Sequence, residues 1–369
     1  MTTAMSRARA FLYLVVERCR HPLQSLYTVH RIPPWSLFFS DKDGRRRAQA
    51  AEEAASEIRE GRLPPPIVTL YPSAGDLPMN FVLFGRGRDK IAATDHLGRA
   101  LLYDDALRAV SALPSAEGPK HAPVSVSVGD DAFFFSSPPD DAHERPVVEA
   151  LADDTYWSRR SEMHWRYVPP PPYATQRPEE GREAGAYDGA VDAYTVVGET
   201  QLWVSARGHG TYSLNTKKIS YGIKGNEVRH GEWSKVGDWA MPFHGRAFFA
   251  PERRLWFGFS ERDQSVLCAA DLRQAGAAAG QPPVVSHEWE GFTVPCQAAV
   301  RSFLLHLGTG DGRFCVAKFS HNASGCGVAM LTGVEVARCV DGVALCLVKH
   351  KTYSYGGLLG DDDKPVCLL

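Results

Sequence analysis

The chain has 369 residues, of which 44% are hydrophobic and 23% are charged, and its formal net charge at pH 7 is −2. This composition is ordinary for a globular protein. The near-neutral charge argues against a nucleic-acid binder, which would carry a basic excess, and no stretch approaches the ~20 apolar residues of a membrane-spanning helix. We therefore expect neither a nucleic-acid partner nor a membrane partner.

The first predicted element is the apolar run 10–16. Glu17 follows this run where a signal peptide would have a small-residue cleavage site. A first β-strand therefore explains the run better than a secretion signal, and we expect a cytoplasmic or nuclear protein. Because the first 16 residues carry no acidic side chain, a mitochondrial transit peptide stays open as an alternative.

The second predicted element is a helical insertion near residues 46–60, which are rich in Ala and Glu and end at Gly61. Elsewhere, short aromatic and β-branched runs alternate with Gly, Pro, Asp and Asn turns. That pattern predicts an all-β domain built from many short strands.

The strands recur in a unit that ends in an apolar residue followed by proline. Repeats of about 40–50 residues with four strands each are typical of propeller blades. The sequence therefore predicts one six-bladed β-propeller over residues 1–369, closed by strand pairing between the N-terminal strands and the last blade. The approximate blades are 10–72, 80–120, 124–172, 191–242, 243–296 and 298–358.

The fourth and fifth units repeat most clearly. Trp203 and Trp256 occupy matching positions in Leu-Trp-hydrophobic strands, and Trp233 matches Trp289 near the end of each unit. Because each blade would bury an aromatic face against the next, we expect all four tryptophans to be buried between blades.

The third unit departs most from the repeat, with long polar and proline-rich stretches at 136–146, 153–164 and 169–190. Tryptophan and arginine are typical of binding hot spots, and long loops in compact domains tend to be functional or disordered. We therefore predict that a protein partner contacts residues 153–166, with flexible insertions as the alternative. The candidate partner-binding residues are Trp157, Arg159, Arg160 and Arg166.

The sequence holds no nucleophile elbow, zinc-protease motif or phosphate-binding loop followed by a helix. Residues 85–90 hold two glycines and three cations that could cradle a phosphate, but a hairpin turn explains them better. The eight cysteines include no Cys-x-x-Cys pair, which favours reduced thiols over a zinc site. We therefore predict no catalytic residues, no metal and no cofactor.

Six segments together resemble a known family. They are 233–247, which begins Trp-Ser-Lys-Val-Gly-Asp-Trp, 255–260, the opening pair 11–15 and 27–32, and the closing pair 300–308 and 314–319. They are similar to the plant family catalogued as domain of unknown function 1668, which is expanded in cereal grasses. The resemblance implies a kelch-like propeller and supplies no catalytic residues.

These observations predict a monomeric, non-catalytic protein-interaction module that binds a partner through propeller loops. An enzyme or a small-ligand binder that uses the central channel is the alternative, and an inactive or structural protein is a third possibility.

Overall fold

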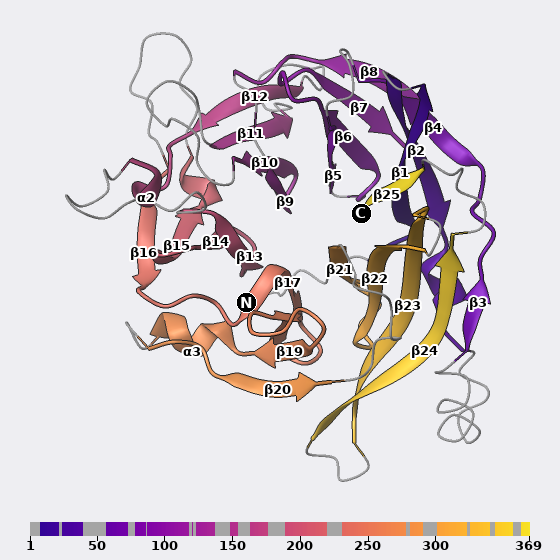
Figure 1. Ribbon diagram of the computed structural model, residues 1–369. Helices are drawn as coiled ribbons and strands as arrows, with labels where there is room; N and C mark the ends of the chain where they lie inside the picture. Colours follow the sequence, from indigo (N-terminus) through magenta and orange to yellow (C-terminus); the bar gives the residue numbers. More distant parts are fainter. Residues whose placement is uncertain are drawn as a thin grey trace. The chain divides into compact units, whose positions relative to one another are not determined.

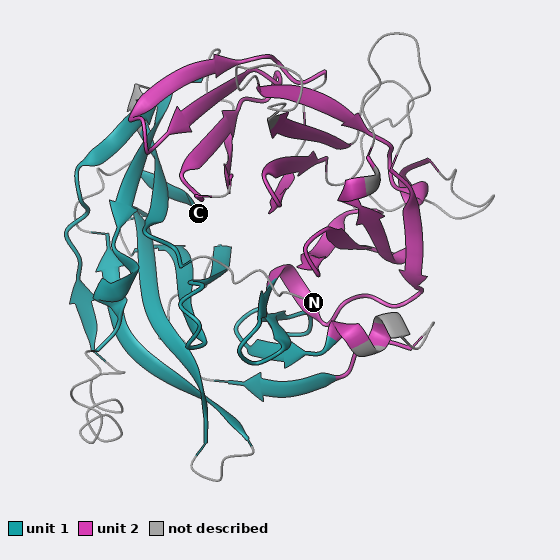
Figure 2. Ribbon diagram, turned by 180° about the vertical axis from the view of Figure 1, so that it is seen from behind, with its two compact units in different colours: residues 1–76, 248–271, 285–369 teal, residues 77–247, 272–284 magenta. Residues whose placement is uncertain are grey.

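The computed structural model describes most of the chain and divides it into two compact units (Figures 1 and 2). Unit 1 contains residues 1–76, 248–271 and 285–369, and unit 2 contains residues 77–247 and 272–284. Strands dominate the described part, which is all-β with several sheets. The described residues are 8–21, 24–39, 57–72, 78–85, 87–117, 120, 123–136, 148–153, 163–175, 189–219, 231–277, 281–290, 301–322, 325–339, 344–356 and 363–369.

Unit 2 contains three consecutive sets of four antiparallel strands, each ordered as in the sequence. The edge of the third set, β13, also pairs in parallel with the first half of β17, where Tyr194 lies opposite Arg246. Unit 2 also holds the short helices α2 (Pro172–Thr175) and α3 (Leu272–Ala277) and the 3-10 turn η3 (Thr216–Lys218). The strands are β5 (Asn80–Phe84), β6 (Lys90–Thr94), β7 (Ala100–Asp104), β8 (Ala109–Leu113), β9 (Val124–Val128), β10 (Asp131–Phe135), β11 (Val148–Asp153), β12 (Met163–Val168), β13 (Val191–Val197), β14 (Gln201–Ala206), β15 (Gly210–Asn215), β16 (Trp233–Gly237) and β17 (Phe243–Ala250).

The middle sheet of unit 2 is covered on both faces, and β10 shows why. Its sequence Asp-Ala-Phe-Phe-Phe is buried from Ala132 onward. Successive side chains of a strand point to opposite faces, so Phe134 packs into a cluster with β5, β6 and β7, whereas Phe133 and Phe135 pack into a cluster with β14 and β15. A continuous apolar run is therefore what this position requires.

Aspartate and asparagine side chains form the turns between strands, as the repeat predicted. Asp95 follows β6, and its Oδ1 accepts hydrogen bonds from the backbone N–H groups of Leu97 and Arg99, both at 2.9 Å. Asp104 accepts from the N–H of Leu107 at 2.9 Å, and Asn215 caps η3. Short polar side chains that bond the following backbone favour such turns.

Unit 1 holds a sheet in which the two ends of the chain meet. The order β25-β1-β2-β4 places β25 beside β1, with Leu368 opposite Leu14. The predicted first strand at 10–16 is confirmed, although β1 continues to His21. The strands of this sheet are β1 (Leu12–His21), β2 (Gln24–Ile32), β4 (Pro66–Leu70) and β25 (Lys364–Leu368), and the 3-10 turn η1 (Pro34–Leu37) follows β2.

The other strands of unit 1 form one meander of three strands and one sheet of five. Their side chains join those of β1 and β2 in a single apolar cluster, in which Phe257 lies 5.1 Å from Phe314 between ring centroids. The strands are β18 (Leu255–Ser260), β19 (Leu267–Ala270), β20 (Val285–Trp289), β21 (Arg301–His306), β22 (Arg313–His321), β23 (Gly327–Arg338), β24 (Leu345–Tyr355) and β3 (Ile58–Glu60).

The prediction of a helical insertion near 46–60 is wrong for the last residues of that range. Residues 58–60 form β3, which pairs in parallel with β24 and places Ile58 opposite Thr352. Pairing with a neighbouring strand outweighs the local helix propensity of the sequence here. The rest of the predicted helix, residues 46–56, lies outside the described residues.

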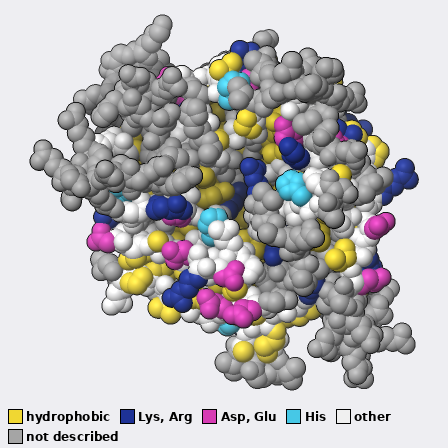
Figure 3. Space-filling model, in the orientation of Figure 1, with side chains coloured by type: hydrophobic (Ala, Val, Ile, Leu, Met, Phe, Trp, Pro, Cys, Tyr) yellow, Lys and Arg dark blue, Asp and Glu magenta, His cyan; other side chains and the backbone are white. Residues whose placement is uncertain are grey.

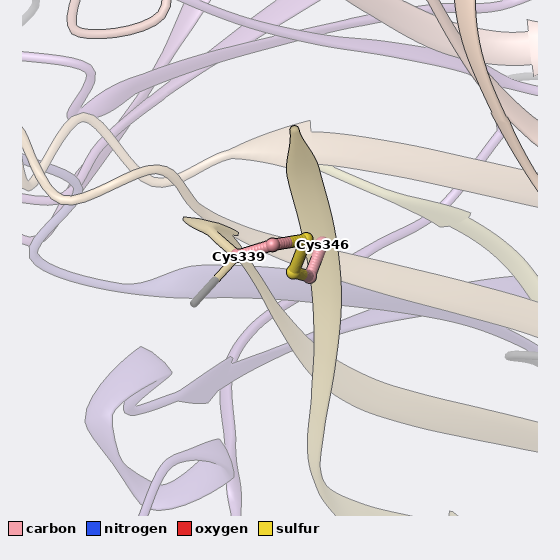
Figure 4. Close-up of a disulfide and its surroundings, with 2 residues drawn as sticks. All are labelled: Cys339 and Cys346. Carbon is pink, nitrogen blue, oxygen red and sulfur yellow. A yellow bond between two sulfur atoms is a disulfide. The ribbon is translucent and has the colours of Figure 1, made fainter. Parts of the chain in front are cut away.

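The expectation that all cysteines are reduced is also wrong. Cys339 and Cys346 form a disulfide, with their Cα atoms 5.3 Å apart, where β23 and β24 pair near the end of their ladder (Figure 4). Strand pairing places the two side chains together, which the sequence spacing alone did not indicate. Cys268, Cys315 and Cys326 are buried.

The four repeated tryptophans fall into two classes. Trp203 is 7% exposed and Trp256 is 1% exposed, so both are buried as expected. Trp233 and Trp289 are only partly buried, although each packs against a core cluster. Their burial was therefore overestimated, because each lies on an edge strand that has a neighbour on one side only within its described sheet.

Candidate functional site

Unit 2 contains a pocket of about 490 Å³ beside β15 and β16. This volume lies within the range of ligand pockets, roughly 300–1,000 Å³. Its lining comes from three separate segments: the turn between β14 and β15, the end of β16, and α2. The lining residues are Pro172, Gly208, His209, Tyr212, Lys235 and Asp238.

The turn between β14 and β15 forms one wall, and glycine is required in it. Gly208 and Gly210 have φ angles of +80° and +88°, which residues with a Cβ atom rarely adopt. A Cβ on Gly210 would lie 2.4 Å from the carbonyl oxygen of Gly237 and 2.9 Å from the Cα of Asp238. The two walls of the pocket thus meet through backbone contact, which holds His209 near Asp238.

Buried hydroxyl groups fix the segment that carries Asp238. The Oγ1 of Thr211 donates to the carbonyl oxygen of Trp239 at 2.7 Å and lies 2.8 Å from the Oγ of Ser205. That Oγ in turn accepts from the backbone N–H of Met241 at 2.9 Å. Thr211 and Ser205 are almost completely buried. Asp238 is therefore presented from an ordered backbone although its own side chain is exposed.

The ring of Tyr212 lines the pocket, and Tyr173 packs behind it. The imidazole of His209 stacks on Tyr173 of α2 at 5.6 Å between centroids, and Tyr173 lies 5.3 Å from Tyr212. Burial, with a smaller contribution from Tyr212, raises the pKa of Tyr173, so its hydroxyl stays neutral. The proline run before α2 packs on the protein, because the carbonyl oxygen of Pro169 accepts from the indole N–H of Trp233 at 2.8 Å.

A pair of opposite charges forms the rim. The Nζ of Lys235 lies 2.5 Å from the Oδ1 of Asp238 and 5.7 Å from the centroid of the Tyr212 ring. The hydrogen bond to Asp238 is the main cause that raises the pKa of Lys235. The side chain of Lys235 is 46% exposed and that of Asp238 is 93% exposed. Surface ion pairs of this kind stabilise a fold little, so both groups are available to a ligand.

Of the four predicted partner-binding residues, only Arg166 belongs to the described part of the chain, and it is not among the residues that line the pocket. Trp157, Arg159 and Arg160 lie outside the described residues, so the surface at 153–166 stays a prediction. Arg166 lies in β12, where its Nε donates to the Nε2 of His164 at 2.9 Å and its side chain is 9% exposed. In this arrangement Arg166 holds β12 side chains together and offers a partner little surface.

Sequence reasoning did not single out Lys235 and Asp238, although both lie in the segment that carries the family resemblance. His209 stood out only as a histidine between two glycines. The usable signal was the pair of glycines, because a turn of this kind brings its central side chain close to a neighbouring strand. On the face shown in Figure 3, basic and acidic side chains of the described residues lie interspersed.

The glycine-rich segment at 85–90 forms a hairpin turn between β5 and β6, as favoured over a phosphate site. The N–H of Arg88 donates to the carbonyl oxygen of Gly85 at 3.0 Å. Arg88 adopts a φ of +50°, and burial lowers its pKa.

Unit 1 holds two pairs of a buried histidine and a partly buried glutamate. The Nε2 of His306 lies 3.1 Å from Glu252, and the imidazole packs 4.9 Å from the Phe314 ring. His350 contacts Glu335 through Nε2, while its Nδ1 accepts from the N–H of Phe39. Structural contacts thus use both ring nitrogens of His350, and the buried imidazole of His306 is held by Glu252 and the Phe314 ring. Within the described ranges, no group of three His, Cys, Asp or Glu side chains is arranged to hold a metal ion, and no helix is long and apolar enough to cross a membrane.

Comparison with known proteins identifies a family and includes a distant likeness to a solved structure. One solved structure, apo AztD from Citrobacter koseri, aligns with 94% of this chain and 98% of its own at 12% sequence identity. The TM-score of 0.36 shows that the two structures are only weakly alike. No curated protein matches the sequence. The model of the family described as protein of unknown function, DUF1668, matches residues 9–355, which is nearly the whole chain. The chain therefore belongs to the DUF1668 family.

Proposed function

We propose that this chain is a non-catalytic protein-interaction module and that its pocket beside β15 and β16 receives a segment of a protein partner. The observation that carries the proposal is the pocket itself, in which the ring of Tyr212 lies beside an exposed Lys235–Asp238 pair on an ordered backbone. A few precisely placed polar groups give a binding pocket its specificity, and here those groups are Lys235, Asp238 and His209.

The polar groups of the pocket bond with one another and are not arranged for nucleophilic catalysis, since Lys235 pairs with Asp238. The imidazole of the pocket, His209, stacks on a tyrosine, and no serine, cysteine or threonine is among the residues that line the pocket. A nucleophilic mechanism requires a nucleophile within hydrogen-bond reach of its base. Binding without chemistry is therefore the function that this arrangement supports best.

We also propose that the sheets are blades of a six-bladed, kelch-like propeller in one domain. Three of the predicted blades, 80–120, 124–172 and 191–242, each contain one set of four antiparallel strands. Within unit 2, the middle sheet packs on its neighbours through alternate residues, as blades do. Pairing of β1 with β25 joins the two ends of the chain in one sheet, which is how closed propellers protect their edges. Small-angle scattering would test this, because a closed ring and two separated units differ in radius of gyration.

Photo-cross-linking tests the function. A benzophenone side chain would replace His209 in the pocket, and in a control variant it would replace Tyr71, an aromatic residue of unit 1 that is 66% exposed. In an extract of cells that express the protein, we expect a discrete cross-linked partner from position 209 that disappears when Lys235 and Asp238 are also replaced. The same products from both positions, or products that survive the replacement, would show that the pocket is not the binding site.

A further inference from the structure

The charges on the rim of the pocket restrict what it can bind. The ammonium group of Lys235 only donates hydrogen bonds, and the carboxylate of Asp238 only accepts them. The two groups lie 2.5 Å apart, so a ligand group that reaches one also meets the other. A partner carboxylate attracted by Lys235 would be repelled by Asp238. A partner ammonium or guanidinium group would be attracted by Asp238 and repelled by Lys235. The rim therefore gives a single charge no net attraction.

A group with a donor and an acceptor side by side fits both. The carboxamide of asparagine or glutamine has a carbonyl oxygen that can accept from Lys235 and an NH₂ group that can donate to Asp238. Because the Lys235–Asp238 contact is exposed and contributes little to folding, a ligand can replace it at small cost.

The remaining lining agrees with a neutral occupant. Tyr173, which packs against the lining residue Tyr212, stays neutral because burial raises its pKa. Pro172 and the Gly208 backbone add no charge at the opening. His209 is the remaining titratable lining group, and it stacks on Tyr173.

Resting on the proposed function, we infer that the pocket selects a partner segment by an uncharged asparagine or glutamine side chain, which inserts between Lys235 and Asp238. The carboxamide oxygen accepts from the Lys235 ammonium, and its NH₂ group donates to the Asp238 carboxylate. Acidic and basic side chains are excluded at this position.

A displayed library of random peptides, selected on the full-length protein, tests the inference. For the unmodified chain we expect asparagine or glutamine to be enriched roughly tenfold at one position. Asp238→Asn leaves a cationic rim and should switch the enrichment to aspartate and glutamate. Lys235→Met leaves an anionic rim and should switch it to lysine and arginine. Lys217→Met, at an exposed lysine of η3 that does not line the pocket, is the matched control and should leave the selection unchanged.

The outcomes separate the two proposals. Enriched peptides that carry a charged residue at the selected position of the unmodified chain would overturn the inference and leave the proposed function intact. Unaltered selection by Asp238→Asn and Lys235→Met would overturn both, because the peptides would then bind outside the pocket. Circular dichroism of each variant confirms that it is folded. Because Lys235 and Asp238 are exposed, we expect no loss of structure.

Discussion

Replacing Trp256 by alanine tests the core packing of unit 1. The side chain is 1% exposed, and its ring lies 4.5 Å from that of Phe249. A fully buried tryptophan removes about 200 Å² from water, which at ~25 cal/mol per Å² corresponds to about 5 kcal/mol. Residual burial in the unfolded chain reduces this by roughly 10–40%. We therefore expect Trp256→Ala to lower the free energy of unfolding by about 3–5 kcal/mol.

Two other tryptophans supply matched comparisons. Trp289 is partly buried and stacks on Phe257 at 6.1 Å, so Trp289→Ala should cost less, about 1–2 kcal/mol. Trp35 is 65% exposed, and Trp35→Ala should change stability by no more than ~0.5 kcal/mol.

Urea unfolding followed by far-ultraviolet circular dichroism measures all three variants, since fluorescence would itself change with each tryptophan. If the two units unfold in separate steps, the loss from Trp256→Ala should fall on the transition of unit 1. A midpoint for Trp256→Ala equal to that of Trp35→Ala would refute the packing argument.

Three further predictions concern buried polar groups and the disulfide. Glu149 is 1% exposed and pairs with Lys120. Lys120→Met should therefore destabilise unit 2 by about 3–5 kcal/mol in urea unfolding, and adding Glu149→Gln should recover much of the loss. Burial is the main cause that lowers the pKa of His30 below 6.5. The neutral imidazole is thus favoured in the folded state, and its contribution to stability should be present above about pH 6.5 and fall as the pH drops toward the lower folded-state pKa. His30→Gln should flatten that part of the stability–pH curve, and an unchanged slope would contradict the assignment. In a thiol titration of the denatured chain, two fewer thiols should react without reductant than with it. Cys346→Ser cannot form the disulfide with Cys339, so this difference should disappear in that variant.

Local sequence was sufficient for the strands and their turns. The apolar run of β10 and the aspartates at the ends of β6 and β7 favour strand and turn through residues only a few positions apart, so composition and spacing indicate them. The family resemblance also located the segment that contains β16 and the start of β17.

Long-range pairing could be predicted only in outline. The sequence indicated that N-terminal strands pair with the last blade, and β3 does pair with β24, but the particular partners of most strands and side chains could not be inferred. β25 joins β1 across almost the entire chain, and Lys120 meets Glu149 only because their segments fold together. The pocket has the same origin, since α2, the 207–210 turn and the end of β16 are separate in sequence. Composition indicated Trp157 and its neighbouring arginines instead. A sequence shows the type of each residue, but it does not show which residues come together to form a pocket.

Hydrogen–deuterium exchange on the chain with and without its cross-linked partner tests the central claim most directly. Peptides that cover 207–212 and 233–239 should gain protection when the partner binds, because they contain the turn, the Tyr212 ring and the rim of the pocket. Protection confined to 153–166, with no change at the two pocket segments, would contradict the account and place the binding surface on the third predicted blade.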